Sequence, residues 1–153
     1  MSLRSLVLEV APATPAESAA AMAEKLKFHT DAWDLAVDLA NGVDDIVVVD
    51  TRSQAHYLAG HIPGAINIPH VEMTSERLAT LDRSRVYISY CDGIGCNGST
   101  WGAFKLASAG LQVKELLGGL DFWKRDAHQV VTGPEPGSLR GHELTSCGCG
   151  EMS

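Results

Sequence analysis

The sequence lacks the features that would place it in a membrane or on a nucleic acid. Its longest apolar stretches, such as Ile46 to Val49, are strand-length, whereas a membrane-spanning helix needs roughly 20 apolar residues. The 12 Lys and Arg residues form no run and are outnumbered by 19 Asp and Glu, so the net charge of -7 argues against nucleic acid or anionic lipid as a partner. Met1 to Val10 lacks the apolar core and cleavage site of a secretory signal, so we expect a cytoplasmic protein.

Cysteine is also scarce. The four cysteines form two close pairs, Cys91 with Cys96 and Cys147 with Cys149, which is too few for a disulfide framework. Close pairs of this kind are more often reactive or metal-binding. The second pair has only His142 as a further ligand nearby, which does not complete a zinc site. We therefore expect no metal and interpret this pair as incidental cysteines in a tail.

Helical and strand patterns alternate along most of the chain. The predicted helices run from Pro15 to about Phe28, from the cap Thr30 to Asn41, from the cap Ser53 to Ala59, from the cap Thr74 to about Leu81, from the residues after Thr100 to Gly110, and from Leu120 to Arg125. The predicted strands are 46–49, 66–68, 86–90 and 113–116. This alternation indicates an α/β fold with a central, mostly parallel sheet.

The same patterns divide the chain into three segments. We expect residues 1–43 to form a helical extension packed on the domain, and residues 44–130 to form the domain itself. Residues 131–153 are dense in Gly, Pro and Ser and show no apolar period. They should form an irregular tail whose removal after Thr132 leaves the fold intact.

The motif that carries chemistry is a Gly-rich loop directly after the predicted strand Val86 to Tyr90. It begins with Cys91 and continues through Asp92, Gly93, Ile94, Gly95, Cys96, Asn97 and Gly98. Backbone N–H groups of such a loop and of the following helix favour an anion, and both a thiolate and a persulfide are anions. Cys91 is therefore a candidate nucleophile. On this local pattern alone, a small buried structural cysteine is an equally good interpretation.

Several segments around this loop resemble the rhodanese-like domain family. Val48 to Arg52 and Tyr57 to Pro69 resemble its first signature, and Tyr90-Cys91, Leu106 to Gly110 and Leu117 to Trp123 resemble its active-site and closing motifs. The resemblance spans about Asp44 to Val130. It implies a three-layer sandwich in which helices flank the mostly parallel sheet, with the strand-end cysteine as the carrier of sulfur.

The loop departs from the usual family pattern. Typical single-domain rhodaneses place an Arg five residues after the cysteine, whereas here that residue is Cys96 and the next is Asn97. The form resembles a bacterial rhodanese-like subgroup. Because the loop has no cation and carries Asp92, we expect it to bind the doubly charged thiosulfate less well than a loop with a guanidinium would.

Four further residues are weighed as supporting groups. Asp50 and Arg52 end a predicted strand near the loop, where a structural ion pair or a helix cap is favoured over catalysis. Trp101 begins the helix after the loop and is expected to line a pocket. His61 lies in a turn that belongs to the family's fold motif, so the resemblance implies a hydrogen-bonded structural histidine.

We predict a sulfurtransferase that carries a sulfane sulfur as a persulfide on Cys91, held by the backbone amides from Asp92 to Gly98, and that needs no cofactor. The expected partners are a small-molecule sulfur donor and a thiol acceptor, and the sequence leaves a homodimer open. One alternative is a redox or binding module that uses a reversible disulfide between Cys91 and Cys96. Another is a phosphatase or arsenate reductase, because the spacing from Cys91 to Asn97 matches the longer loops of such enzymes. The missing Arg argues against that alternative.

Overall fold

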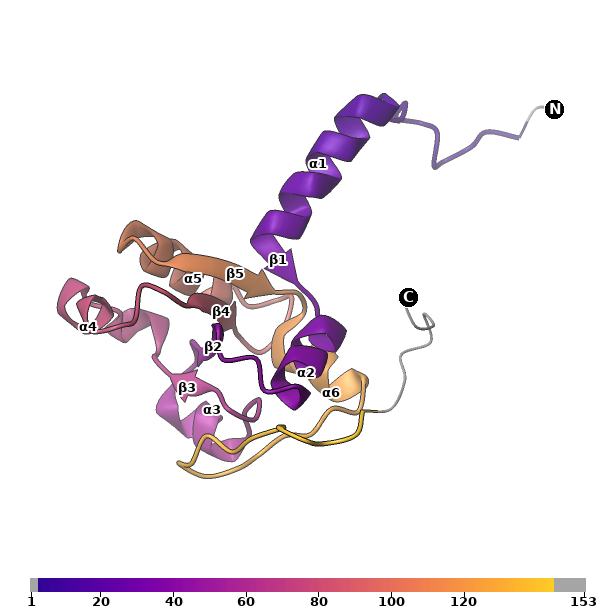
Figure 1. Cartoon of the computed structure of the whole chain (residues 1–153). Helices are drawn as coiled ribbons and strands as arrows, with labels where there is room; N and C mark the ends of the chain where they lie inside the picture. The colour runs from indigo at the N-terminus through magenta and orange to yellow at the C-terminus, as the bar shows by residue number, and fades with distance from the viewer. Residues whose placement is uncertain (1–2, 145–153) are drawn as a thin grey trace.

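The computed structural model describes residues 3–144 and contains one five-stranded sheet (Figure 1). All neighbouring strands are parallel, in the order β1-β5-β4-β2-β3. The strands are β1 (His29–Thr30), β2 (Ile46–Asp50), β3 (Ile66–Asn67), β4 (Val86–Tyr90) and β5 (Gln112–Leu116). The helices are α1 (Pro15–Phe28), α2 (Ala32–Ala40), α3 (Gln54–Ala59), the 3-10 turn η1 (His70–Glu72), α4 (Ser75–Ala79), α5 (Gly98–Ser108) and α6 (Gly119–Arg125).

The sheet lies between two layers of helices because successive side chains of a strand point to opposite faces. In β2, Val48 belongs to a core shared with α2, α3 and α6, whereas Val49 belongs to a second core shared with α4 and α5. Ile88 and Tyr87 of β4 divide between the same two cores. This confirms the predicted three-layer α/β sandwich with a parallel central sheet.

The sequence analysis missed one strand and misplaced one helix cap. Thr30, predicted to cap α2, lies in strand β1, which pairs with β5 at the edge of the sheet. The cap of α2 is Asp31, whose carboxylate accepts a hydrogen bond from the backbone N–H of Asp34 at 2.8 Å. A polar strand of two residues carries no apolar pattern, so only its pairing partner reveals it.

The N-terminal extension packs on the domain only in part. Helix α2 does so through the buried side chains of Leu35 and Ala36. Helix α1 has no buried residue and extends away from the sheet (Figure 1). Its Met22 and Leu26 are exposed. The end of α1 reaches the sheet, where Nζ of Lys114 in β5 donates to the carbonyl of Leu26 at 3.0 Å. The division of the chain into an extension, a domain and a tail stays a prediction.

The segment after α6 is irregular, as predicted, but its described part packs on the domain. Val131 and His61 form an antiparallel bridge, and the N–H of Gly64 donates to the carbonyl of Pro136 at 2.7 Å. Leu139 is only 3% exposed and joins the core beside α2 and α6. These contacts argue against the expectation that removal of the chain after Thr132 leaves the fold intact, and the effect of that truncation stays a prediction. A single buried leucine among Gly and Pro residues creates no hydrophobic periodicity, so the sequence pattern does not predict its burial.

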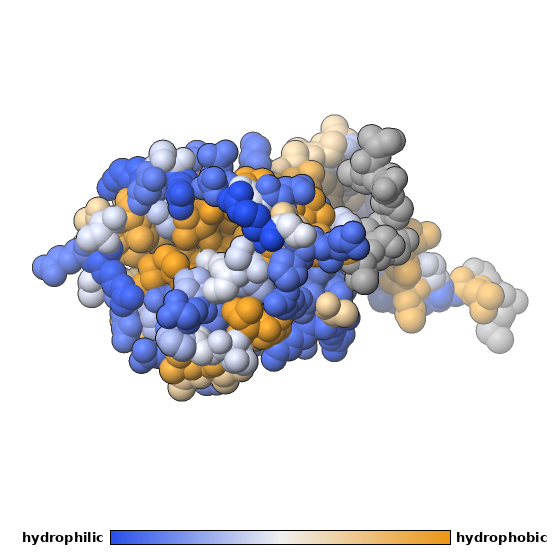
Figure 2. All heavy atoms as spheres, turned by 60° about the horizontal axis from the view of Figure 1, so that its bottom comes forward, coloured by the Kyte–Doolittle hydropathy of each residue, from blue (hydrophilic) through white to orange (hydrophobic). Residues whose placement is uncertain are grey.

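The interpretation of Cys147 and Cys149 as incidental cysteines in a tail lies outside the described residues. Within residues 3–144, no helix has both the length and the apolar character needed to cross a membrane. On the face that carries α3 and the segment after α6, hydrophobic patches are separated by hydrophilic side chains (Figure 2).

Candidate active site

The centre of the site is where β2 and β4 end side by side. Their register pairs Asp50 with Tyr90, the last residue of each strand. The Tyr90 hydroxyl donates to Oδ2 of Asp50 at 2.6 Å and accepts from the backbone N–H of Ile62 at 3.1 Å. Burial, and secondarily the Asp50 charge, raises the pKa of Tyr90 above its ordinary value. The hydroxyl therefore remains a hydrogen-bond donor to the carboxylate at neutral pH.

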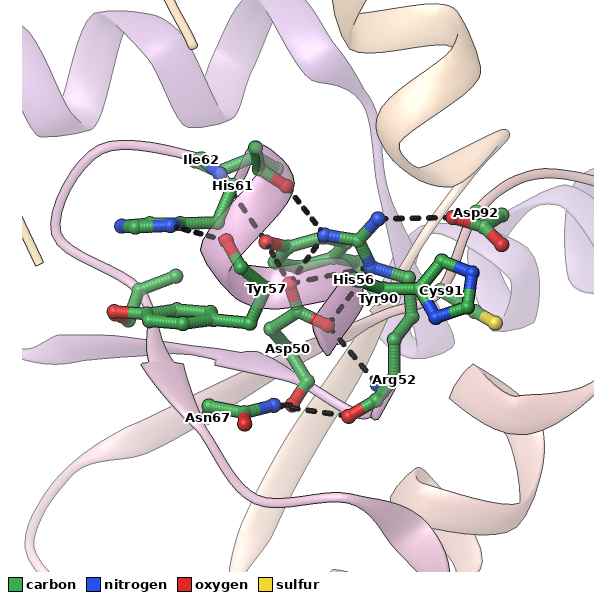
Figure 3. Close-up of polar contacts among 12 residues, drawn as sticks. Asp50, Arg52, His56, Tyr57, His61, Ile62, Asn67, Tyr90, Cys91 and Asp92 are labelled. Carbon is green, nitrogen blue, oxygen red and sulfur yellow. Dashed lines mark hydrogen bonds and ion pairs between the residues drawn. The ribbon is translucent and has the colours of Figure 1, made fainter. Parts of the chain in front are cut away.

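The guanidinium of Arg52 fills the space between strand β2 and the loop (Figure 3). It donates from Nε and Nη2 to the two oxygens of Asp50 at 3.0 and 2.7 Å, from Nη1 to Asp92 at 2.9 Å, and from Nη2 to the carbonyl of Gly60 at 2.6 Å. Burial opposes its charge, but the hydrogen bond and charge of Asp50, together with the hydrogen bond to Asp92, outweigh burial and raise the pKa of Arg52. The predicted structural ion pair is present.

Cys91 follows β4 directly, and its sulfur forms a disulfide with Cys96 across a Cα–Cα distance of 6.3 Å. Cys91 is buried, with 4% of its surface exposed, whereas Cys96 is half-buried. The loop turns at Gly93, whose carbonyl accepts from the N–H of Cys96 at 3.1 Å. The N–H of Gly98 points at the Cys96 sulfur, 3.4 Å away. The sequence analysis expected loop amides to point at Cys91, and in this disulfide state the first amide of α5 points at its partner.

Glycine is needed at residue 98 because the sulfurs pack against it. A Cβ built on Gly98 would lie 3.0 Å from the Cys91 sulfur and 3.4 Å from the Cys96 sulfur. Helix α5 begins at this glycine, and the side chain of Asn97 makes no capping hydrogen bond to it. The first residue of α5 thus lies next to both sulfurs, and its N–H donates to the sulfur of Cys96. The start of a helix is where a negatively charged sulfur is stabilised.

The start of α6 holds the loop from the other side. The N–H groups of Leu120 and Asp121 donate to the carbonyls of Cys91 and Asp92 at 3.0 and 2.7 Å. Gly119 precedes them with φ of +55°, and an added Cβ there would overlap the carbonyl oxygen of Cys91. Gly119 of the closing motif therefore lets α6 approach the backbone of Cys91, which the sequence pattern alone did not reveal.

A hollow of about 300 Å³ adjoins the loop at Asp92. Its other lining residues are Arg52, His56, Ala59, Gly60, Leu120, Asp121 and Lys124. The sequence analysis missed His56 and Lys124, which come from α3 and α6 and have no motif in common. The two cations Arg52 and Lys124 and the two carboxylates of Asp92 and Asp121 all line the hollow, so it carries no strong field for a doubly charged anion.

The remaining predicted residues lie apart from this hollow. Trp101 is 49% exposed on α5, with its ring packed edge to face on Phe104 at a centroid distance of 6.0 Å, so it does not line the hollow. Ile94 is exposed at the tip of the loop, beside Gly95, which has open space around it. His61 is buried, stacks on Tyr57 and lies 2.8 Å from its carbonyl, which confirms a structural histidine. Within residues 3–144, no group of three or more His, Cys, Asp or Glu side chains is arranged to hold a metal ion.

Comparison with known proteins places this fold in one family. Residues 34–126 match the rhodanese-like domain model, and the chain belongs to the rhodanese-like domain family. Its fold is that of the sulfurtransferases. A crystal structure of a Bacillus halodurans protein is 35% identical with a TM-score of 0.75, covering 88% of this chain and 96% of that chain. The thiosulfate sulfurtransferase of Pseudomonas aeruginosa shares the fold, with a TM-score of 0.61 and 22% identical residues. The match covers 80% of this chain and 23% of the chain of that enzyme.

One relative of known name is a transcriptional regulator. It is an HTH-type transcriptional regulator of Mycobacterium tuberculosis, 37% identical over 123 residues, which are 80% of this chain and 54% of the relative. The present chain thus spans about half the length of that relative.

Proposed function

We propose that the protein is a sulfurtransferase that carries a sulfane sulfur on Cys91 and passes it to a thiol. The observation that carries this proposal is the position of Cys91. It stands at the carboxyl end of β4, its carbonyl is fixed by Leu120 of α6, and its sulfur packs against Gly98, the first residue of α5. These contacts aim one buried sulfur at the uncapped start of a helix, which suits a thiolate and a persulfide.

The transfer needs no cofactor. The Cys91 thiolate attacks the outer sulfur of a donor such as glutathione persulfide, the new S–S bond forms, and the donor leaves as a thiolate. An acceptor thiolate then attacks the outer sulfur on Cys91, and the Cys91 thiolate leaves with the electron pair of the broken bond. The loop amides from Asp92 to Gly98 are the groups proposed to stabilise the two anionic forms of Cys91.

The partners that this site favours are small thiols and persulfides rather than thiosulfate or nucleic acid. Arg52 is the guanidinium next to the loop, and its charge is already balanced by Asp50 and Asp92. Thiosulfate carries two negative charges and gains little from a cation so paired. The net charge of -7 likewise disfavours nucleic acid. A homodimer stays a prediction.

Cysteine variants and intact mass test the proposal. The reduced protein is incubated with glutathione persulfide, the donor is removed, and a thiol acceptor is added. Cys91→Ser should gain no sulfur and transfer none, because a serine hydroxyl is not ionised at neutral pH and cannot hold a sulfane sulfur. Cys96→Ser should gain one sulfur atom and pass it on. A sulfur atom on Cys96 of Cys91→Ser would assign the nucleophile to the other cysteine.

The disulfide between Cys91 and Cys96 favours a second candidate, a redox-responsive module. The relative named as a transcriptional regulator also supports a signalling use of such a domain. In this candidate an oxidant removes two hydrogens from the cysteine pair and no sulfur is carried. Incubation of Cys96→Ser with a persulfide separates the candidates, since this variant cannot form the disulfide and only a sulfurtransferase then gains a sulfur atom.

A phosphatase or arsenate reductase receives no support from the described residues. Asn97 stands in the loop where such enzymes use a cation, and Arg52 makes its hydrogen bonds to Asp50, Asp92 and Gly60. Phosphoryl transfer requires a positive charge close to the equatorial oxygens of the substrate, where it stabilises their negative charge. This loop does not supply such a charge.

A further inference from the structure

The two loop cysteines are placed to react with each other. Their sulfurs are bonded in the structure, with the Cα atoms 6.3 Å apart, which is within the usual range for a disulfide. The turn from Gly93 to Cys96 brings the second cysteine back over the first. The atom that Cys96 reaches is the Sγ of Cys91, which is the inner sulfur of a persulfide carried on that residue.

The two sulfurs also differ in exposure and in hydrogen bonding. Cys91 is buried, and Cys96 is half-buried in the wall of the loop. The N–H of Gly98 donates to the Cys96 sulfur and would stabilise a thiolate there as well. A thiol from solution therefore meets Cys96 first, whereas Cys96 meets Cys91 from within the loop.

Building on the proposed sulfur-carrying role of Cys91, we propose that Cys96 is a resolving thiol that converts the Cys91 persulfide into free sulfide and an internal disulfide. The protein would then act as a persulfide reductase whose product is sulfide, in addition to passing sulfur to acceptors. Thiols of the solution are its electron donors.

The resolving step is an ordinary thiol–disulfide exchange. The Cys96 thiolate attacks the Sγ of Cys91, the Cys91–Cys96 bond forms, and the bond from Cys91 to the outer sulfur breaks. The outer sulfur leaves as hydrosulfide with the electron pair. An external acceptor must instead reach a buried persulfide in a bimolecular step, whereas Cys96 is already held in the same loop, so the internal reaction has the higher effective concentration.

Reduction of the Cys91–Cys96 disulfide depends on the greater exposure of Cys96. A thiolate from solution attacks the half-buried sulfur of Cys96, and the Cys91 thiolate leaves toward the start of α5. A second thiolate then attacks the mixed disulfide and frees Cys96. Over the cycle, one persulfide and two thiols become one thiol, one sulfide and one external disulfide, so that sulfur, hydrogen and electrons balance.

A single-turnover experiment without oxygen tests the inference. The reduced protein is mixed with one equivalent of glutathione persulfide, sulfide is followed with an electrode, and the intact mass is taken at the end. The expected result is one equivalent of sulfide and a protein lighter by two hydrogens. Cys96→Ser and Cys96→Ala should release no sulfide above the background given by Cys91→Ser, and should each be heavier by one sulfur atom.

The outcomes separate this inference from the proposed function. If the Cys96 variants gain no sulfur although they are folded by circular dichroism, the proposed sulfur-carrying role fails. If they gain sulfur but the wild-type protein also keeps it and releases no sulfide, the carrier role stands and the resolving role is overturned. In a second stage, limiting glutathione is added to the oxidised wild-type protein. A mixed disulfide on Cys96 supports the regeneration step, and one on Cys91 contradicts it.

Discussion

Nη1 of Arg52 donates to Oδ1 of Asp92 at 2.9 Å and so joins the end of β2 to the residue that follows Cys91. The same guanidinium is paired with Asp50 on its other side. One cation near the loop therefore faces two carboxylates. This balance of charge gives the loop its expected preference for persulfide donors.

Removing the loop carboxylate should improve the use of thiosulfate. In Asp92→Asn, Arg52 keeps Asp50 as its ion-pair partner and the loop loses a negative charge, so kcat/KM for thiosulfate should rise about fivefold, which corresponds to about 1 kcal/mol. Asn97→Arg should raise it as well. The value for glutathione persulfide, measured in parallel, should change less. An equal response of both donors to Asp92→Asn would contradict the charge argument.

Crowding the two sulfurs should slow sulfur uptake. Gly98→Ala places a methyl group 3.0 Å from the Cys91 sulfur, closer than nearly all real contacts, so the loop must shift. We expect the rate of persulfide formation to fall about tenfold, equivalent to about 1.4 kcal/mol in the barrier. The matched variant Gly95→Ala adds the same group where nothing lies within 4 Å and should cause a much smaller loss. Equal losses in the two variants would show that the contact with the sulfurs is unimportant.

The segment after α6 should contribute to stability. Leu139→Ala removes a buried side chain that packs on the core, at an expected cost of about 2–5 kcal/mol in the free energy of unfolding. Leu3→Ala, at a leucine that is 98% exposed, should change it by less than about 0.5 kcal/mol. Truncation after Thr132 should lower the melting temperature by more than about 5 °C. An unchanged melting temperature would mean that the segment only rests on the surface.

Stability should fall in mild acid because of His128. Burial lowers the pKa of His128 below its ordinary value of 6.5, although the charge of Asp126 opposes this. Its Nε2 is buried and has no hydrogen-bond partner among residues 3–144, and its ring centroid lies 4.7 Å from that of Trp123. Below pH 6.5 the unfolded chain therefore binds a proton that the folded protein resists. The free energy of unfolding should decrease from that pH down to the folded-state pKa, by at most about 1.4 kcal/mol per pH unit.

Chemical denaturation followed by tryptophan fluorescence at about pH 7.5 and about pH 5.5 measures this loss. His128→Phe keeps an aromatic ring beside Trp123 but cannot be protonated. The difference in stability between the two pH values should be smaller in His128→Phe than in the wild-type protein. If the stability difference between the two pH values were the same in His128→Phe and in the wild-type protein, groups other than His128 would cause the acid sensitivity.

The sequence by itself determined the elements whose signals are local. The caps Ser53 and Thr74 lie where the side-chain pattern predicts them, because a cap bonds to a backbone N–H only a few residues away. Strand β4 has its predicted bounds, since a continuous apolar run is typical of a strand buried on both faces. With the family motifs, these signals were enough for the fold and for the position of Cys91 at the end of a strand.

The tertiary structure alone decided what depends on contacts between distant segments. Arg52 meets Asp92 across 40 residues, and Leu120 and Gly119 of α6 fix the backbone of Cys91. Leu139 enters the core from a segment with no apolar period. The contacts of Arg52, Gly119 and Leu120 follow from the parallel register of β2 and β4 and from where the chain returns to their carboxyl ends, whereas Leu139 packs where the chain returns to the end of α2. No local pattern records such a return, because the energy of a long-range contact depends on positions in space rather than on neighbours in the chain.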